Sequence, residues 1–176
     1  MFCRKIVEKK LKLGVLILSL FVMTQCAPKS ASELPKDILG VSIGMNKTEV
    51  EQHLREVGQL ERLESKHQEV WVLPENTRYS RVALGYDGDD KIRYITAFAR
   101  HQENVTQIKY EDFGDMKTAR QNVFLAGKEY VWEVPAQNDK PGYFIIIRGN
   151  DPTYAVTASM MQSGATKESE EEEDKD

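Results

Sequence analysis

The residues Val70-Trp71-Val72-Leu73-Pro74 and Val131-Trp132-Glu133-Val134-Pro135 carry most of the information about the fold. Each stretch is an apolar, β-branched and aromatic run that a proline stops, which is typical of a β-strand. The shift that superposes one on the other also superposes Gly88 on Gly149, Asp90 on Asp151, Thr96 on Thr157 and Ala97 on Ala158. This pattern predicts two tandem copies of one unit. A single irregular antiparallel sheet with similar hairpins is the alternative.

Each copy is expected to contain a meander of antiparallel strands. In the first copy, the turn Asp87-Gly88-Asp89-Asp90 separates the strands expected at 81–86 and 91–99. Aspartate and glycine favour such turns because they tolerate positive φ. Candidate first strands of the two copies lie at 60–65 and 122–126.

Helices are expected on one face of this sheet. Asn46 can cap a helix with Glu49 three residues on, and Val50, Leu54 and Val57 recur at helical spacing before Gly58, which predicts a short amphipathic helix over 46–58. A degenerate second helix is expected at 106–113. The predicted fold class is therefore α+β, with short helices packed on one face of an antiparallel sheet in two tandem helix-plus-meander units.

Alternation along the strands predicts which side chains face the core. Tyr130 and Trp132 should face the helices, together with Ile95, Ala97, Ala99, Val156, Ala158 and Met160. The opposite face should carry Ile92, Tyr94, Thr96 and Phe98 in the first copy, and Thr153, Ala155, Thr157 and Ser159 in the second. Because aromatic rings are favoured binding anchors, we predict that Ile92, Tyr94, Thr96 and Phe98 bind a protein partner. Alternatively, a tail, a loop or the other half covers them.

The N-terminus has the features of an export signal. Five basic residues precede an apolar run at 13–23, which is too short to span a bilayer core of about 30 Å. Cys26 follows directly, at the position where a bacterial lipoprotein signal places its lipidated cysteine. We therefore expect cleavage before Cys26 and membrane attachment through acyl chains on it. Ordinary signal-peptidase cleavage, leaving a soluble periplasmic protein, is the alternative.

The chain divides into four expected parts: a signal peptide at 1–25, the lipidated cysteine and a tether at 26–35, one compact domain at 36–166, and a tail at 167–176. The two pseudo-repeats of the domain span about 40–100 and 101–162. The tail holds seven acidic residues and no apolar one, which predicts disorder and a solubilising role. A cation-binding or partner-steering role is the alternative.

Composition argues against several functional classes. The net charge of −4 and the absence of a basic stripe argue against nucleic-acid binding. Cys3 and Cys26 both precede the domain, so cysteine nucleophiles and zinc ribbons are excluded there. The histidines, His53, His67 and His101, are isolated, and the aspartates around Gly88 lack the glutamate of a calcium loop. We expect no metal, no cofactor and no enzymatic activity.

One stretch resembles a known family. Ile43-Gly44-Met45-Asn46-Lys47-Thr48-Glu49-Val50, followed by Leu54 and Gly58, is similar to the opening of the SmpA/OmlA (BamE-like) lipoproteins. In that family, the opening helix precedes a strand with a tryptophan and a hairpin with an Asp-Gly turn, as Trp71 and Asp87-Gly88 do here. A tandem repeat of such units also resembles the β-lactamase-inhibitor-protein fold, whose concave sheet grips another protein.

These observations predict a bacterial envelope lipoprotein, anchored by lipid to the outer membrane, that acts as a non-catalytic protein-binding module. The resemblance implies a role in outer-membrane protein assembly or envelope maintenance. The first alternative is an inhibitor or surface-exposed binder of a foreign or host protein. The second is an enzyme that binds a small ligand or a metal.

Overall fold

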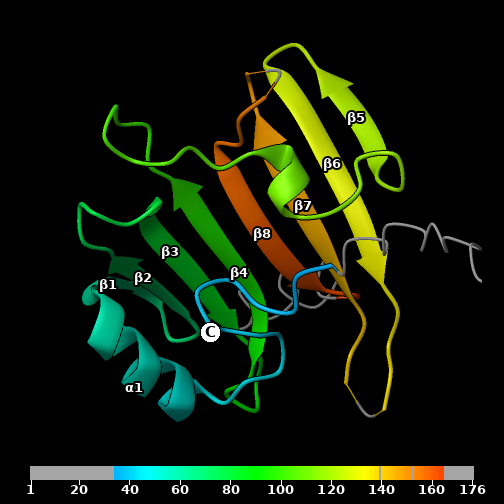
Figure 1. Cartoon of the computed structure of the whole chain (residues 1–176). Coiled ribbons are helices and arrows are strands. Elements are labelled where there is room, and N and C mark those ends of the chain that lie inside the picture. The colour runs from blue at the N-terminus through cyan, green and yellow to red at the C-terminus, as the bar shows by residue number, and fades with distance from the viewer. Residues whose placement is uncertain (1–33, 139, 152, 165–176) are drawn as a thin grey trace, which may run out of the picture. The chain divides into compact units, whose positions relative to one another are not determined.

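The computed structural model describes residues 34–138, 140–151 and 153–164. They form one antiparallel sheet with the strand order β1-β2-β3-β4-β8-β7-β6-β5 (Figure 1). The strands are β1 (Gln59–Ser65), β2 (Gln68–Val72), β3 (Tyr79–Tyr86), β4 (Ile92–Ala99), β5 (Arg120–Phe124), β6 (Gly127–Val134), β7 (Tyr143–Gly149) and β8 (Thr157–Gln162). The helices of this part are α1 (Lys47–Val57) and one 3₁₀ turn, η1 (Tyr110–Asp112).

The predicted α+β fold class is wrong, because the described residues form mostly one sheet with a single α-helix. The helix expected at 106–113 is absent from them, and so the two helix-plus-meander units are absent too. This segment is extended up to η1, and Lys109 forms a β-bridge with Tyr154. Ile108 and Tyr110 are both buried two positions apart, which is the spacing of extended chain rather than of an amphipathic helix.

The helix predicted at 46–58 is confirmed as α1. The Asn46 side chain accepts a hydrogen bond from the Thr48 backbone N–H at 3.0 Å, which satisfies one of the free donors at the helix start. Val50 and Leu54 are fully buried one turn apart. The helix ends at Gly58, whose N–H donates to the Leu54 carbonyl.

The hairpin predicted around Gly88 is confirmed as β3, a turn and β4. The Asp87 carboxylate accepts hydrogen bonds from the N–H groups of Asp89 and Lys91, both at 2.9 Å. The residue with positive φ is Asp90, at 55°, whereas Gly88 is not in that region. The aspartate cluster is thus explained by the needs of the turn.

The sheet consists of two four-stranded meanders, β1 to β4 and β5 to β8, joined through β4 and β8. At the junction Thr96 lies opposite Ser159, and their hydroxyl oxygens are 3.1 Å apart. The same strand pairing occurs on both sides of this junction. Trp71 lies opposite Val82 in the first meander, and Trp132 lies opposite Ile145 in the second. A pseudo-twofold axis therefore passes through the sheet between Thr96 and Ser159.

The repeat register predicted from the sequence holds only for part of the chain. Trp71 and Trp132 are equivalent, but the connection from β6 to β7 is longer by two residues than that from β2 to β3. Beyond it Thr96 is therefore equivalent to Ser159, not to Thr157. The sequence matches of Thr96 with Thr157 and of Ala97 with Ala158 are thus not structural equivalences, and the presence of two tandem copies stays a prediction.

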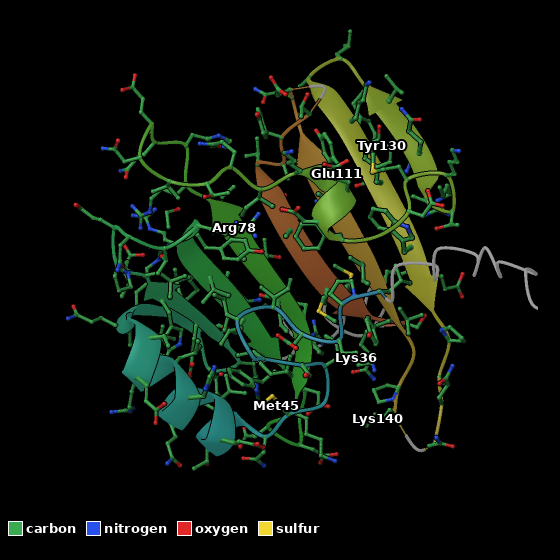
Figure 2. All side chains as sticks on the ribbon, in the orientation of Figure 1. Lys36, Met45, Arg78, Glu111, Tyr130 and Lys140 are labelled. Carbon is green, nitrogen blue, oxygen red and sulfur yellow. The ribbon has the colours of Figure 1, made fainter. Side chains whose placement is uncertain are left out.

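One face of the sheet carries the hydrophobic core. Three segments lie on this face in Figure 1: α1, the chain at 34–46, and the connection at 100–119 that contains η1. Figure 2 labels Tyr130 on β6, and its ring centroid lies 4.9 Å from that of Tyr110. The buried cluster joins these segments to strand residues that include Trp71, Val82, Leu84, Ile95, Ala97, Trp132, Ile145, Ile147, Ala158 and Met160.

Candidate functional site: the open sheet face

The other side of the sheet, which we call the open face, has no described segment packed over it. Strand register places on it the apolar, aromatic and hydroxyl side chains of Val70, Val72, Ala83, Tyr94, Thr96, Phe98, Val131, Phe144, Ile146, Thr157, Ser159 and Met161. The same register places on it the charged and amide side chains of Arg62, Gln68, Arg81, Arg120, Glu129, Glu133 and Arg148. Val70 and Val131 are buried by their neighbours, yet they do not belong to the core cluster of the other face. Large apolar side chains therefore line both faces, although only one face has a cover among the described residues.

Tyr94 lies flat on the open face. It is opposite Gly85 on β3, and a Cβ atom built at Gly85 would lie 1.9 Å from the Tyr94 ring. The ring therefore occupies the space above the glycine, which explains its partial burial. Burial raises the pKa of the Tyr94 hydroxyl, with Arg93 lowering it and Glu64 raising it. The hydroxyl is thus a neutral hydrogen-bonding group on an otherwise apolar ring.

Three of the four predicted partner-binding residues lie on the open face. Tyr94, Thr96 and Phe98 alternate along β4, and Phe98 is 39% exposed. Their binding of a partner stays a prediction. Ile92 is misplaced in that prediction, since it is fully buried in the core.

The error at Ile92 comes from a β-bulge. Gly85 lies opposite Tyr94, whereas the next residue, Tyr86, lies opposite Ile92. Arg93 is therefore an extra residue, and it reverses the alternation at the start of β4. A strict period of two applied to the sequence cannot show this.

The open face also holds apolar residues that sequence reasoning missed: Val70 and Ala83 in the first half, and several in the second half. Met161 lies opposite Tyr94, and Phe144 lies opposite Met161. Ile146 and Val131 continue the face across β7 and β6. The uninterrupted apolar run from Phe144 to Ile147 is a signal for a strand with two apolar faces.

In the second half, only some expectations for the open face are confirmed. Thr157 and Ser159 lie on it, but Ala155 is buried in the core. Thr153 lies in the connection before β8. These differences arise because β8 begins only at Thr157, so strict alternation does not extend to the residues before it.

A buried carboxylate borders the open face near the β5 edge. Glu129 is 7% exposed and accepts hydrogen bonds from Asn122 Nδ2 at 2.8 Å and Arg148 Nε at 2.6 Å. Burial raises the pKa of Glu129, but these two hydrogen bonds and the positive charges of Arg148 and Arg120 outweigh it, so the pKa is lowered. Glu129 is therefore an anion that holds the arginine in place, not a proton donor.

A shallow depression of about 460 Å³ lies beside this pair. It is bordered by Phe124 from β5, Arg148 from β7 and Thr157 from β8, the last of which lies opposite Phe98. The depression therefore continues the open face toward the turn between β5 and β6.

The second buried carboxylate, Glu69, lies on the covered face. It accepts hydrogen bonds from Trp71 Nε1 at 3.1 Å and from the Tyr86 hydroxyl at 3.0 Å. Lys47 of α1 lies 3.3 Å from its other oxygen. With all these partners the carboxylate holds α1 against β2 and β3, which is a structural role.

The described residues contain no group of three or more His, Cys, Asp and Glu side chains that could hold a metal ion. Among the histidines, His53 has a ring nitrogen 2.7 Å from the Leu39 carbonyl. In the same part of the chain, no helix is long and apolar enough to cross a membrane. Cys26 and the acidic tail lie outside the described residues.

Comparisons with known proteins give no relative for this chain: no family model, curated protein or solved structure matches it.

Proposed function

We propose that this protein is a lipid-anchored bacterial envelope protein that binds another protein through its open face and performs no chemistry. The observation that carries the proposal is a set of partly exposed apolar and aromatic side chains, bordered by charged ones, on a sheet face that no described segment covers. Exposed apolar patches of this kind mark interaction surfaces. Tyr94 and Phe98 are the expected anchors, with Met161, Phe144 and Ile146 completing the surface.

The N-terminal sequence supports the membrane attachment. The basic start, the apolar run at 13–23 and Cys26 occur in the order that a lipoprotein signal requires. The resemblance of residues 43–50 to the SmpA/OmlA opening favours work at the outer membrane, in protein assembly or envelope maintenance. Mass spectrometry of the mature N-terminus should find an acylated Cys26. An unmodified N-terminus from conventional cleavage would contradict the anchor.

Site-specific photocrosslinking in intact cells tests the docking surface. A photoreactive amino acid at Phe98 should crosslink to a defined partner, whereas the same group at Leu63, which is 63% exposed on β1, should not. Equal crosslinking from both positions would contradict a specific role of the open face. A resident assembly protein as partner would favour the scaffold, and a foreign or host protein would favour an inhibitor or adhesin.

The double variant Tyr94→Ala/Phe98→Ala separates binding from folding. We expect it to abolish the crosslink, carried at Thr96, while the melting temperature changes little, since both side chains are partly exposed and lie outside the core cluster. Leu60→Ala/Leu63→Ala is the matched control, because these side chains are also exposed but lie on β1. A large loss of stability in the first variant would show that Tyr94 and Phe98 serve the fold instead.

A further inference from the structure

The pseudo-twofold axis relates two hairpin turns at opposite ends of the sheet. In the β1–β2 turn Ser65 lies opposite Gln68, and the two residues between them are Lys66 and His67. In the β5–β6 turn Phe124 lies opposite Gly127, and the residues between them are Leu125 and Ala126. The same turn is thus polar in one half and apolar in the other.

The apolar turn is the most exposed hydrophobic part of the described chain. Val123 is 70% exposed, Phe124 is 56% exposed and Leu125 is fully exposed. Because the equivalent turn is polar, the fold itself does not require apolar residues here. Three consecutive exposed apolar residues therefore call for an apolar environment outside the protein.

The charges around this tip suit insertion into a bilayer. No acidic residue lies between Val123 and Lys128. The nearest carboxylate, Glu129, is held by Arg148 and Asn122. Lys128 can keep its ammonium group at the level of lipid head groups while its stem lies along apolar surface.

One further carboxylate lies near the base of the hairpin. Gly127 approaches Gly149 and Asn150 of the β7–β8 connection, and Asp151 follows. Its side chain accepts hydrogen bonds from the N–H groups of Thr153 and Tyr154. The two positive charges near the tip, Lys128 and Arg148, thus equal in number the two negative charges there, Glu129 and Asp151. Because these charges sum to zero, we expect the tip to enter a bilayer of zwitterionic lipid.

We propose that the β5–β6 tip, Val123 to Lys128, enters the interfacial layer of a lipid bilayer and gives the domain a second membrane contact. This inference rests on the proposed anchoring at Cys26. The eight residue-to-residue steps from Cys26 to Leu34 span at most about 28 Å, so the lipid would hold the domain within reach of the membrane surface. A protruding apolar tip beside a shallow apolar depression fits lipid head groups and the first methylenes of their chains.

Tryptophan fluorescence in vesicles tests the contact on the full chain. Leu125→Trp is compared with Lys66→Trp, the equivalent position of the polar turn, in phosphatidylcholine vesicles with and without brominated acyl chains. The native Trp71 and Trp132 are buried and give a constant background. We expect the indole introduced by Leu125→Trp to emit at shorter wavelength in vesicles and to be quenched by bromine, and the one introduced by Lys66→Trp to do neither.

The outcomes separate the tip from the anchor. If the chain co-sediments with vesicles but the indole of Leu125→Trp stays unquenched, the tip contact is overturned and the anchor stands. If that indole is already blue-shifted without lipid, the tip is buried against protein, which also overturns the inference. If the chain does not co-sediment at all, the anchor and the tip contact fail together.

Discussion

The two halves of the sheet place a tryptophan at equivalent positions, but the indole N–H groups of the two tryptophans have different hydrogen-bond acceptors. Trp71 Nε1 donates to the Glu69 carboxylate under α1. Trp132 Nε1 lies 3.2 Å from both the Asp115 carbonyl and the Thr118 hydroxyl, in the connection that covers the second half. The same strand framework thus accepts a charged partner beneath a helix and neutral partners beneath a non-helical segment.

The carboxylates of the two halves differ in the same way. Glu69 points to the covered face, where it is 2% exposed and holds α1 through Lys47. Glu129 points to the open face and holds Arg148 there. One half uses its buried carboxylate to hold α1, and the other uses it to hold Arg148 on the open face. The framework therefore does not dictate what each face does.

Replacing each tryptophan gives the largest expected effect. Trp71→Ala and Trp132→Ala should each lower the free energy of unfolding by about 3 to 5 kcal/mol, because each leaves a cavity in the core. Trp71→Ala should cost about 1 to 3 kcal/mol more, since it removes a donor from the buried Glu69 carboxylate, whereas Trp132→Ala removes one only from neutral acceptors. Urea unfolding followed by circular dichroism measures both. Trp71→Phe and Trp132→Phe keep an aromatic ring but remove the indole N–H, so the loss of stability should again be larger at Trp71. Equal losses of unfolding free energy in these two variants would contradict the difference between the halves.

The ion pair beneath α1 should contribute less. Lys47→Met should cost about 1 to 3 kcal/mol, below the value for a fully buried pair because Lys47 is 24% exposed. In a Glu69→Gln background the same change should cost little, because the buried charge is already gone. An unchanged cost in that background would show that Lys47 acts through packing alone.

The smallest expected effect concerns the open face and depends on pH. Because the pKa of Glu129 is lowered on folding, its contribution to stability is present above the ordinary pKa of a glutamate and is lost as the pH falls through the folded-state value. Glu129→Gln should therefore be less stable than the wild type by about 1 kcal/mol at pH 7. Chemical unfolding at several pH values should show this difference disappear in acid. A difference that persisted there would rule out the charge as its cause.

Local signals in the sequence predicted much of the first half. The cap at Asn46 and the spacing of Val50 and Leu54 predicted α1 because a helix start and an apolar stripe are read within a few residues. The turn after Asp87 predicted its hairpin for the same reason. The placement of Tyr94 and Phe98 on one face followed from alternation within a single strand.

Non-local features could not be predicted in the same way. The extended cover at 106–113 depends on a bridge from Lys109 to Tyr154, which lies far along the chain. The bulge at Arg93 and the longer β6–β7 connection shift register without changing the hydrophobic pattern. The apolar tip at Leu125 is visible in the sequence, but its full exposure is known only from the structure.

The position of β8 has a consequence for how the protein is made. Among the strands of the described residues it comes last in sequence, yet it lies between β4 and β7 in the middle of the sheet. Until Thr157–Gln162 has been synthesised, the two meanders have no strand to join them and both β4 and β7 are unpaired edges. A nascent chain therefore cannot complete this sheet before β8 has been synthesised.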